Sequence, residues 1–551
     1  MNNNEHLILD THISHFPNLL QYNHKPHIIF PEKNHGRSVF VSGNSCFGGD
    51  VISRLSIRES ENPEYIIFDE RGSYEYSQMN FFNGRLRPSI YLHDSEGKTR
   101  RIKSDSIKDL ISYWREDTEK YPLPHQSIRT FESIAKKRGF HLYHPQMRYI
   151  SYFELDPEAF PVPEKITKTL SKDFVNFATR YGRSLGTNEI RARISEYENF
   201  FIGEKDFYSY ENSVMTLGSA NALWLILKTF LFGGAKRLLI HCPSYYQFTL
   251  AAHNLDIQWQ HIHKKQRISN LDSTNIDYRS IIPTYEDVEK AIDDNPDMGA
   301  LILSDPGLPY GKRLYSEEIR KLAQKAKDEG WIIIVDETLG DLDFSKTSDE
   351  FKNWKWIDHS LPLIRIKSLS KTFGLSGSRL GYLCMANSIK DMVINGKKAI
   401  DILAEEVDAA YSSPPSSGIP VLLAALEILE DYLKDRQTED VLQLRKNISK
   451  LKKRSDVALK TLSSYNVPYI APDCGSSVMI FLDKLSPYPR KNFEFFKSLL
   501  KEHSMFIELG GIFNQNPNWN FTAARIGLGR ADKDFEKDIV KFCQFYSSFR
   551  G

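Results

Sequence analysis

Cysteine and long apolar runs are both scarce in this chain of 551 residues. Its five cysteines stand apart and none forms a CxxC pair, which indicates reduced intracellular thiols rather than a disulfide framework. No apolar run approaches the roughly 20 residues that span a bilayer, and the start MNNNEHLILD has neither the basic nor the apolar part of a signal peptide. We therefore expect a cytoplasmic protein that does not enter a membrane.

An excess of charge of one sign is also lacking, because 72 basic residues stand against 71 acidic ones and the net charge is +1. This balance argues against nucleic acid or an anionic membrane surface as the main partner. Histidine pairs near the N-terminus, such as His12 with His15, have no cysteine or carboxylate at a metal-binding spacing. No metal site is predicted.

The length predicts two or three domains, since single cores stop growing near about 250–300 residues. Residues 1–145 differ from the rest. They hold ten of the sixteen histidines and short β-like runs such as Ser38–Ser42 and Tyr65–Phe68, with one expected helix at Ser104–Trp114. We interpret them as an α+β accessory domain that caps an active site, contributes substrate contacts or builds an oligomer; the sequence does not distinguish these roles.

From about residue 146 onward, apolar strand-like runs alternate with helical patterns. The alternation predicts an α/β fold, a mostly parallel sheet sandwiched by helices, over residues 146–400 with an N-terminal arm at 146–200. A smaller α/β C-terminal domain is expected over 401–551. The expected strands are Ser213–Leu217, Arg237–His241, Ala300–Leu303, Trp331–Val335, Ile364–Lys367, Leu380–Met385, Ser477–Phe481 and Thr522–Gly527, and the expected helices are Ala220–Phe232, Tyr285–Asp293, Ser316–Glu329, Leu422–Leu433 and Thr438–Leu462.

The turn after the first of these strands has a composition suited to an anion. Ligands of such sheets bind beyond the carboxyl ends of the strands. In TLGSANALW (Thr216–Trp224), Gly218 and Ser219 would let a phosphate approach the N-terminus of the helix that follows. Many ordinary strand-to-helix turns have the same composition, so an ordinary turn is an equal alternative.

Two further strand ends carry candidate cofactor contacts. In IHCPSYYQF (Ile240–Phe248), an aromatic ring could stack on a flat ligand or pack at the rim of the core. WIIIVDETLGDL (Trp331–Leu342) ends a buried strand in Asp336. A carboxylate in that position needs a partner, which could be a protonated ring nitrogen or the N-terminus of a helix.

The stretch SLSKTFGLSGSRLGYL (368–383) places one lysine among serines and glycines, with an arginine eight residues later. Ser368 and Ser370 can hydrogen-bond an anion, and Arg379 can bind it through two nitrogens. Lys371 is then left to attack a carbonyl group. Lysine forms Schiff bases, and a desolvated site flanked by cations lowers its pKa toward the nucleophilic form.

The pattern SxSKxxGxxGxRxGY, with the other stretches in the same order, resembles the fold-type I pyridoxal-phosphate enzymes, in particular the class I and II aminotransferases, over about residues 150–545. The resemblance implies that Lys371 forms a Schiff base with pyridoxal 5'-phosphate and that Asp336 pairs with the pyridine nitrogen. The other cofactor-binding residues that it implies are Gly218, Ser219, Ala220, Ser368, Ser370 and Arg379 for the phosphate, and Tyr245 for stacking on the ring.

Two more segments imply a homodimer by the same resemblance. RYGRSLGTNEIR (Arg180–Arg191) is similar to the family segment in which a tyrosine, here Tyr181, reaches the phosphate bound by the partner subunit. YSSPPSSG (Tyr411–Gly418) is similar to a segment near that subunit boundary. In AARIGLG (523–529), the resemblance points to Arg525 as the group that binds the substrate α-carboxylate, with the nearby Arg530 as the competing choice.

The sequence departs from the family pattern at two positions around the cofactor's phenolic oxygen. DPGLPYG (Asp305–Gly311) has Leu308 where the family has an asparagine that donates to this oxygen, and Leu339 stands where the family has a tyrosine. Such donors favour the phenolate and so lower the pKa of the Schiff base. Either another group, such as Tyr310, replaces them or the chemistry has moved away from ordinary transamination.

We therefore expect an enzyme that acts on an amino acid through Schiff-base chemistry, and an aminotransferase that uses a 2-oxo acid as acceptor is the leading interpretation. The alternative is a pyridoxal-phosphate lyase, cyclase or decarboxylase of the same fold, which the two leucines favour. A ligand-sensing regulator behind a DNA-binding head is a third hypothesis. It is disfavoured because the N-terminal segment has balanced charge and a β-rich pattern.

Overall fold

The computed structural model describes residues 148–549 apart from short gaps, the longest at 345–356, and five strands nearer the N-terminus. The chain divides into two compact units, Met1–Tyr121 and Pro122–Gly551. In the first unit the expected strand at Ser38–Ser42 is present, whereas Tyr65–Phe68 and the expected helix at Ser104–Trp114 lie outside the described residues. The five strands are β1 (His6–Ile8), β2 (Arg37–Ser42), β3 (Val51–Ile57), β4 (Ile90–His93) and β5 (Thr99–Lys103).

In that first unit, β2 pairs in parallel with β1 and antiparallel with β3, and β4 pairs antiparallel with β5. The second unit contains the residues with which the rest of this description is concerned. Among the helices that the structure describes, none is both long and apolar enough to cross a membrane.

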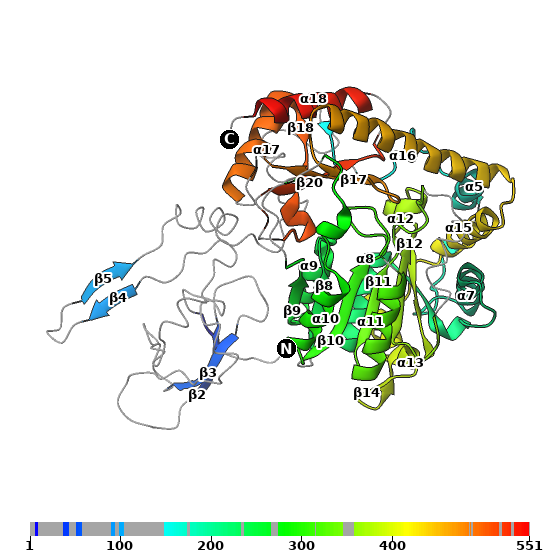
Figure 1. Cartoon of the computed structure of the whole chain (residues 1–551). Coiled ribbons are helices and arrows are strands. Elements are labelled where there is room, and N and C mark those ends of the chain that lie inside the picture. The colour runs from blue at the N-terminus through cyan, green and yellow to red at the C-terminus, as the bar shows by residue number, and fades with distance from the viewer. Residues whose placement is uncertain are drawn as a thin grey trace. The chain divides into compact units, whose positions relative to one another are not determined.

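A seven-stranded sheet forms the centre of the second unit (Figure 1). The strand order is β7-β13-β12-β11-β10-β8-β9, and every neighbouring pair is parallel except the two that involve β13. The fold class expected from the sequence is thereby confirmed. The strands are β7 (Ser213–Thr216), β8 (Arg237–His241), β9 (Trp259–Ile262), β10 (Met298–Ser304), β11 (Ile332–Asp336), β12 (Leu363–Ser368) and β13 (Gly381–Met385).

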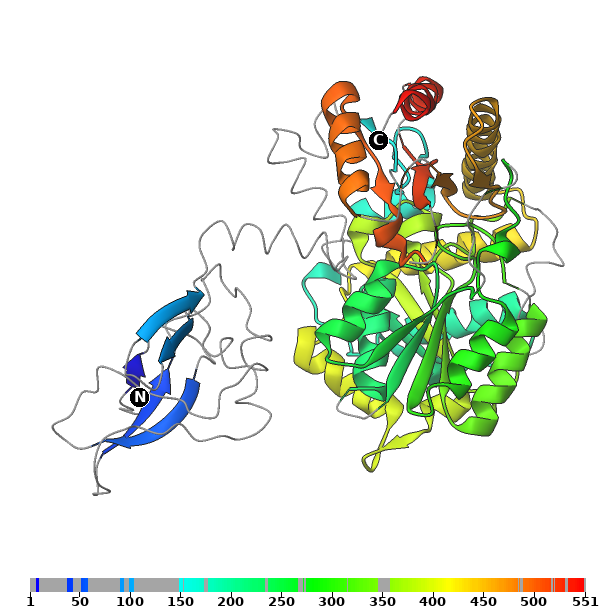
Figure 2. The same cartoon turned by 60° about the vertical axis from the view of Figure 1, so that its left-hand side comes forward.

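Alternate residues of each central strand face opposite layers of helices (Figure 2). In β10, Ala300 and Ile302 pack into one apolar cluster, and Leu301 and Leu303 pack into the other, as the two-residue period of a strand requires. The first cluster includes α8 (Ser219–Phe230), α9 (Tyr246–Asn254) and α14 (Ala399–Tyr411), and the second includes α7 (Asn188–Ile202), α10 (Tyr285–Asp293), α11 (Ser316–Glu329) and α15 (Gly418–Leu433).

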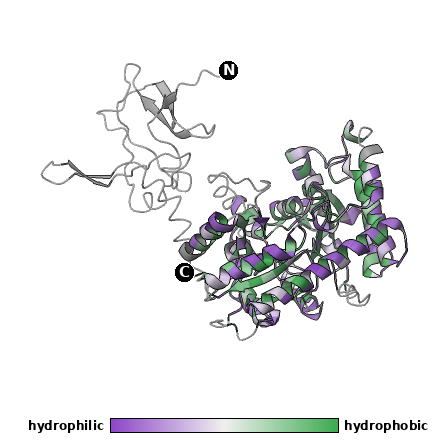
Figure 3. Ribbon diagram, turned by 90° about the horizontal axis from the view of Figure 1, so that it is seen from above, coloured by the Kyte–Doolittle hydropathy of each residue, from purple (hydrophilic) through white to green (hydrophobic). Residues whose placement is uncertain are grey.

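The helices carry polar residues on their outer faces and apolar residues toward the sheet, as the colouring of Figure 3 shows. Their ends follow local chemistry. The Thr284 and Asp287 side chains form a reciprocal capping box at the start of α10. Beyond the end of α11, Gly330 adopts a positive φ of 78°, which a side chain would strain. The sequence predicted both helices with these bounds.

A four-stranded antiparallel sheet of order β16-β17-β20-β19 forms the smaller C-terminal part. The expected strands Ser477–Phe481 and Thr522–Gly527 are β17 and β20, so both are confirmed. β6 (Arg148–Tyr149) pairs in parallel with β18 (Met505–Phe506), so the start of the arm joins this part of the fold. The elements here are β16 (Tyr469–Ile470), β17 (Ser477–Leu482), β19 (Glu508–Leu509), β20 (Thr522–Gly527), α16 (Glu439–Ser464), α17 (Pro489–His503) and α18 (Phe535–Ser548).

Candidate active site

Three strand ends bring the predicted phosphate contacts together. β7 and β12 both pair with β13, and Thr216, Gly381 and Ser368 form one row across the three strands. The chain leaves this row toward Gly218 on one side and toward the lysine-containing segment on the other. A Cβ atom at position 381 would lie 2.9 Å from the Cα of Gly218, so the glycine lets these segments approach.

The guanidinium group of Arg379 lies across the start of α8. Its Nη2 donates to the carbonyl oxygen of Leu217 at 3.0 Å and its Nη1 to that of Ser376 at 2.6 Å. Gly218 precedes the helix with a φ of 83°, and a Cβ there would come within 2.9 Å of Arg379 Nη2. Ser219 and Ala220 are the first two residues of α8. Amide groups at a helix N-terminus beside a guanidinium group suit an anion.

Lys371 lies on the single helical turn α12 (Leu369–Thr372), directly beyond β12. Ser368 caps this turn, because its Oγ accepts from the Ser370 amide at 3.2 Å. The same hydroxyl also donates to Ser370 Oγ at 2.9 Å. The two serines therefore lie together, one turn or less from the lysine, as the motif predicts.

Burial lowers the pKa of Lys371 from 10.5 to about 8. The positive charges of Arg525 and Arg379 act in the same direction, whereas the carboxylates of Glu154 and Glu508 oppose it. The Nζ atom lies 4.4 Å from the centre of the Phe153 ring. About a tenth of this amine is therefore uncharged at pH 7, and the uncharged form is the one that attacks a carbonyl.

Lys367 provides a contrast only four residues earlier. It is also buried, and although burial opposes it, the carboxylates of Glu198 and Asp341 raise its pKa above 10.5. Its Nζ lies 3.6 Å from Glu198 and 3.7 Å from Asp341. Lys367 thus stays protonated within a buried ionic cluster, while Lys371 is held ready to react.

Asp336 is the last residue of β11, so it lies at the same carboxyl-terminal end of the parallel strands as the residues that follow β12. Its Oδ1 accepts from the amide and the hydroxyl of Thr338 at 2.9 and 2.5 Å. The following residues form a turn, not a helix, so the alternative role as a helix N-cap is wrong. Burial raises the pKa of the Asp336 carboxyl, against the lowering effect of the Thr338 bonds. A cation at this position would stabilise the carboxylate.

Tyr245 stands immediately before α9, beyond the end of β8. Its ring meets those of Tyr246 and Phe248 edge to face, with centroids 5.0 and 6.0 Å apart. Burial raises the pKa of its phenol; Tyr246 and Asp336 raise it further, and Arg525 lowers it. The phenol is therefore electrostatically coupled to the predicted ring partner and to the predicted substrate arginine, although the three residues are far apart in the sequence.

Arg525 projects from β20 and is already paired. It lies directly opposite Glu508 of β19, and its Nη2 donates to the buried carboxylate of that residue. The guanidinium carbon lies 4.1 Å from the ring centre of Phe153 and 5.2 Å from that of Phe513. Phe153 thus contacts both Arg525 and Lys371. The Nε atom of Arg525 is buried and has no partner among the described residues.

The competing arginine is engaged elsewhere. Arg530 forms an ion pair with Asp538 at the start of α18, and the same carboxylate also pairs with Arg148. The Arg530 guanidinium lies 5.9 Å from the ring centre of Phe535. Among the described contacts of Arg530, none is with Phe153 or with another residue of the lysine-containing site, so the geometry favours Arg525 as the substrate contact.

Comparison with known proteins shows the family to which the chain belongs. The family described as "Aminotransferase class I and II" matches residues 151–527, which is more than half of the chain. The chain belongs to this family. Its members' chemistry implies that it is a pyridoxal-phosphate-dependent enzyme, as the lysine motif predicts.

Individual relatives of this aminotransferase are distant. The aspartate aminotransferase of Sulfolobus acidocaldarius is 25% identical over 331 residues, covering 60% of this chain and 71% of the relative. That of Sulfurisphaera tokodaii is 24% identical, covering 70% and 86%. The tyrosine aminotransferase of Dictyostelium discoideum is 23% identical, covering 60% and 73%.

A solved structure of the Thermus thermophilus aspartate aminotransferase with maleate superposes with a TM-score of 0.60. It covers 76% of this chain and 95% of that protein at 17% sequence identity, a likeness that speaks for the fold alone.

The residues of this aminotransferase fit the cofactor that the family implies. Asp336 is a buried carboxylate bound to Thr338, suited to a cationic ring nitrogen. The Arg379 guanidinium, the adjacent serine hydroxyls and the start of α8 offer donors to a phosphate. Lys371 offers an amine with a lowered pKa. Each donor set matches one part of pyridoxal phosphate.

Leu308 and Leu339 are both buried in the aminotransferase. Tyr310 is the candidate replacement donor, and its ring packs over Gly307, where a Cβ atom would lie 2.1 Å from the phenol oxygen. The Tyr310 ring also stacks on Tyr278 with centroids 6.4 Å apart. Its surroundings, as far as the structure describes them, are those of a core tyrosine on the β10 side of the sheet.

The sequence analysis missed four residues of the site. Phe153 and Glu154 come from the arm, and Glu508 and Phe513 come from the segment before β20. None belongs to a motif that the chain displays, because each is defined by its neighbours in space. Tyr181, by contrast, is 90% exposed in the single chain.

Proposed function

We propose that Lys371 holds pyridoxal phosphate covalently and that the aminotransferase uses it to move the amino group of an α-amino acid to a 2-oxo acid. The observation that carries the proposal is the position of Lys371 beyond the end of β12, near the strand ends that carry Asp336 and Arg379. Burial there lowers the pKa of Lys371 to about 8. When bound, the cofactor supplies an aldehyde that condenses with amines and a cationic ring that withdraws electrons from the substrate Cα.

Different residues would bind different parts of the cofactor. Arg379, the Ser368 and Ser370 hydroxyls and the amides of Gly218, Ser219 and Ala220 would hold the phosphate. Asp336 would accept a hydrogen bond from the ring nitrogen and stabilise its positive charge. Tyr245 would cover one face of the ring, a role that its place between β8 and α9 permits.

Lys371 then serves as the base. Once freed from the cofactor, its Nζ would accept the proton from the substrate Cα and would return it two bonds away, at the carbon that was the cofactor's aldehyde carbon. The lowered pKa supports this role, because it increases the fraction of the amine that is uncharged near neutral pH and can accept a proton without first losing one.

Arg525 would bind the substrate α-carboxylate. Its Nε, which has no partner among the described residues, would be available to that carboxylate while Nη2 remains with Glu508. Phe153 lies against both this guanidinium group and the Nζ of Lys371. A substrate held by its carboxylate at Arg525 would therefore present its Cα toward the lysine.

A second candidate function is a lyase, cyclase or decarboxylase reaction at the same site. The observation that favours it is that both positions expected to donate to the phenolic oxygen are leucines, and both are buried. Without these donors the protonated Schiff base would persist to higher pH.

Several coarser features complete the proposal. We propose a cytoplasmic homodimer in which Tyr181 reaches the partner's phosphate site. The Gly182 amide donates to Ser413 Oγ at 3.2 Å, so the two predicted boundary segments touch and leave Tyr181 exposed. We also propose residues 146–400 as the cofactor-binding domain, 401–551 as the small domain and 1–145 as an accessory domain.

The test is a product assay with a panel of amino acids and 2-oxoglutarate as acceptor. Transamination predicts equal amounts of a new 2-oxo acid and glutamate, and conversion of the bound cofactor to its amine form when the acceptor is omitted. Consumption of an amino acid with release of carbon dioxide or ammonia, and with no glutamate formed, would instead support the second candidate.

A further inference from the structure

A cysteine and two histidines meet at the end of β8 and β9, outside the cofactor site. Cys242 follows β8 directly, and its amide donates to the carbonyl oxygen of Ile262 at 3.0 Å. His261 and His263 flank Ile262. The parallel register pairs Ile240 with His261 and His241 with Ile262, so the next pair is Cys242 with His263. The three side chains therefore leave the same face of the sheet.

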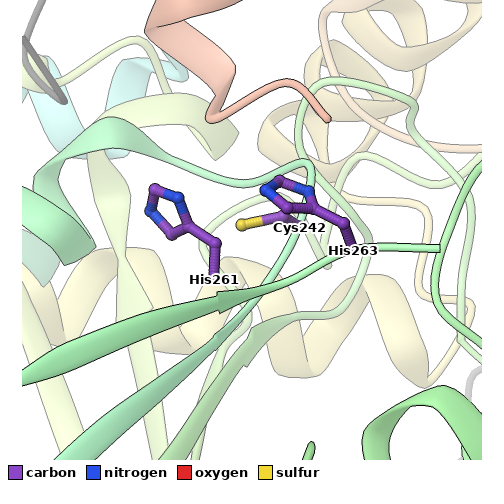
Figure 4. A group of neighbouring side chains, drawn as sticks. All are labelled: Cys242, His261 and His263. Carbon is purple, nitrogen blue, oxygen red and sulfur yellow. The ribbon is translucent and has the colours of Figure 1, made fainter. Parts of the chain in front are cut away.

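The ligand atoms of Cys242, His261 and His263 all lie within 4.8 Å of one another. Figure 4 shows the Cys242 sulfur between the two imidazole rings. In a tetrahedral zinc site with Zn–S near 2.3 Å and Zn–N near 2.0 Å, the ligand atoms are about 3.3–3.6 Å apart. Small side-chain rotations would close the present arrangement onto an ion.

We propose that Cys242, His261 and His263 bind one zinc ion. One thiolate and two imidazoles form a donor set that borderline metals such as Zn²⁺ prefer, and magnesium and calcium do not. Three protein ligands leave a fourth position for water. Because β9 is the edge strand of the sheet, the ion would join this edge to the end of β8.

Two observations support a ligand rather than a group of ordinary core side chains. The Nδ1 atom of His263 is buried and has no hydrogen-bond partner among the described residues, and buried ring nitrogens are rarely left so. The Thr249 hydroxyl of α9 lies 2.8 Å from Nε2 of His261 and orients that ring. An oxygen behind a metal-binding imidazole commonly has this role.

A reactive cysteine is the competing interpretation, and the surroundings of Cys242 disfavour it. Its Sγ donates to the carbonyl oxygen of Ile240 at 3.4 Å and lies 3.6 Å from Ser244 Oγ. The side chain is also buried, whereas reactive cysteines are partly exposed to solvent.

The ion would stabilise the position of the loop that contains Tyr245. Cys242 is three residues before Tyr245, and the intervening Ser244 donates its amide to the Phe513 carbonyl oxygen at 2.8 Å. Phe513 in turn lies against Arg525. The position therefore connects the edge of the large sheet to the segment that lines the proposed substrate contact, without taking part in the chemistry itself.

The test is a metal titration of the chelator-treated, cofactor-loaded full chain. Cobalt(II), which replaces zinc in such sites, should give a thiolate charge-transfer band that saturates at one equivalent per chain, and zinc should abolish it. Cys242→Ser should remove the band, and His263→Ala should weaken binding by more than the roughly 10- to 100-fold that loss of an orienting residue costs. Thr249→Val should fall within that smaller range.

His253→Ala is the matched control, since His253 is an exposed histidine of α9 that is not one of the three proposed ligands. It should bind zinc as tightly as the unaltered chain, and zinc should raise the melting temperature of both but not that of Cys242→Ser. The proposal is overturned if the unaltered chain binds well under one equivalent at micromolar zinc. It is also overturned if folded Cys242→Ser and His263→Ala proteins bind zinc as the control does.

Discussion

Arg525 and Glu508 face each other on neighbouring antiparallel strands, and their side chains form a buried ion pair beside the reactive lysine. A substrate carboxylate that binds Arg525 must therefore share it with a resident carboxylate. The pairing stabilises the guanidinium group in the absence of substrate, since an unpaired buried charge is costly. It also sets the orientation in which the remaining N–H groups can donate to a ligand.

Arg525→Lys tests whether this arginine binds substrate. Lysine keeps the charge but loses the two-nitrogen geometry, so the KM of the preferred amino acid should rise by roughly 10-fold or more with a smaller change in kcat. Steady-state kinetics provide the measurement. Arg530→Lys is the control, because Arg530 is bound to Asp538, and it should leave KM unchanged. Equal effects of the two variants would contradict the assignment.

The rate of cofactor loading should depend on pH through Lys371. Burial lowers the pKa of this amine to about 8, and its uncharged form is the nucleophile. Below that pH the uncharged fraction rises about tenfold per pH unit, and above it the fraction levels off. Stopped-flow absorbance after adding pyridoxal phosphate to the cofactor-free protein should follow this curve. A midpoint near 10.5 would show that the lysine is not buried as described.

Leu339→Tyr should restore a donor to the cofactor's phenolic oxygen. A hydrogen bond to the charged form favours that form, so the pH at which the visible absorption of the bound cofactor changes should fall by roughly one unit or more. A spectrophotometric pH titration of both proteins measures the difference. Leu339→Phe, which has the ring without the hydroxyl, should keep the original midpoint; a shift of equal size in both variants would assign the effect to packing.

A mixture of two inactive variants tests the dimer. If Tyr181 acts across the interface, a hybrid of Lys371→Ala and Tyr181→Ala chains holds one complete site, made of Lys371 from one chain and Tyr181 from the other. Random reassociation of equal amounts should then restore about a quarter of the unaltered activity. No recovery, although sedimentation shows that hybrids form, would place Tyr181 in the site of its own chain or outside it.

Local sequence chemistry was sufficient for most of the fold. The buried strands at 298–304 and 332–336 are apolar except for their last residues, and the helix at 316–329 has a regular apolar stripe with a glycine after it. The edge strand β9, with sequence WQHI, was not predicted, because it is half exposed and lacks such a run. His261 in this strand and His263 directly after it, two residues apart and so on one face, were the signal that could have indicated the proposed metal site.

The candidate site divides in the same way. Lys371, Arg379 and Asp336 were predictable because each belongs to a short stretch of sequence next to one end of a strand. Glu508 and Phe153 were not, since their positions depend on how β19 and the arm pack against β20. The sequence of a segment says little about which distant segment it will pair with.

The most direct test of the account is to identify the lysine that holds the cofactor. Borohydride reduction of the protein with bound pyridoxal phosphate, followed by proteolysis and mass spectrometry, should place the pyridoxyl group on Lys371 in nearly every labelled peptide. Lys367, which lies four residues away and is buried, has its pKa raised by carboxylates and should carry no label. Label on Lys367 or spread over surface lysines, or a protein that stays colourless with excess cofactor, would contradict the account.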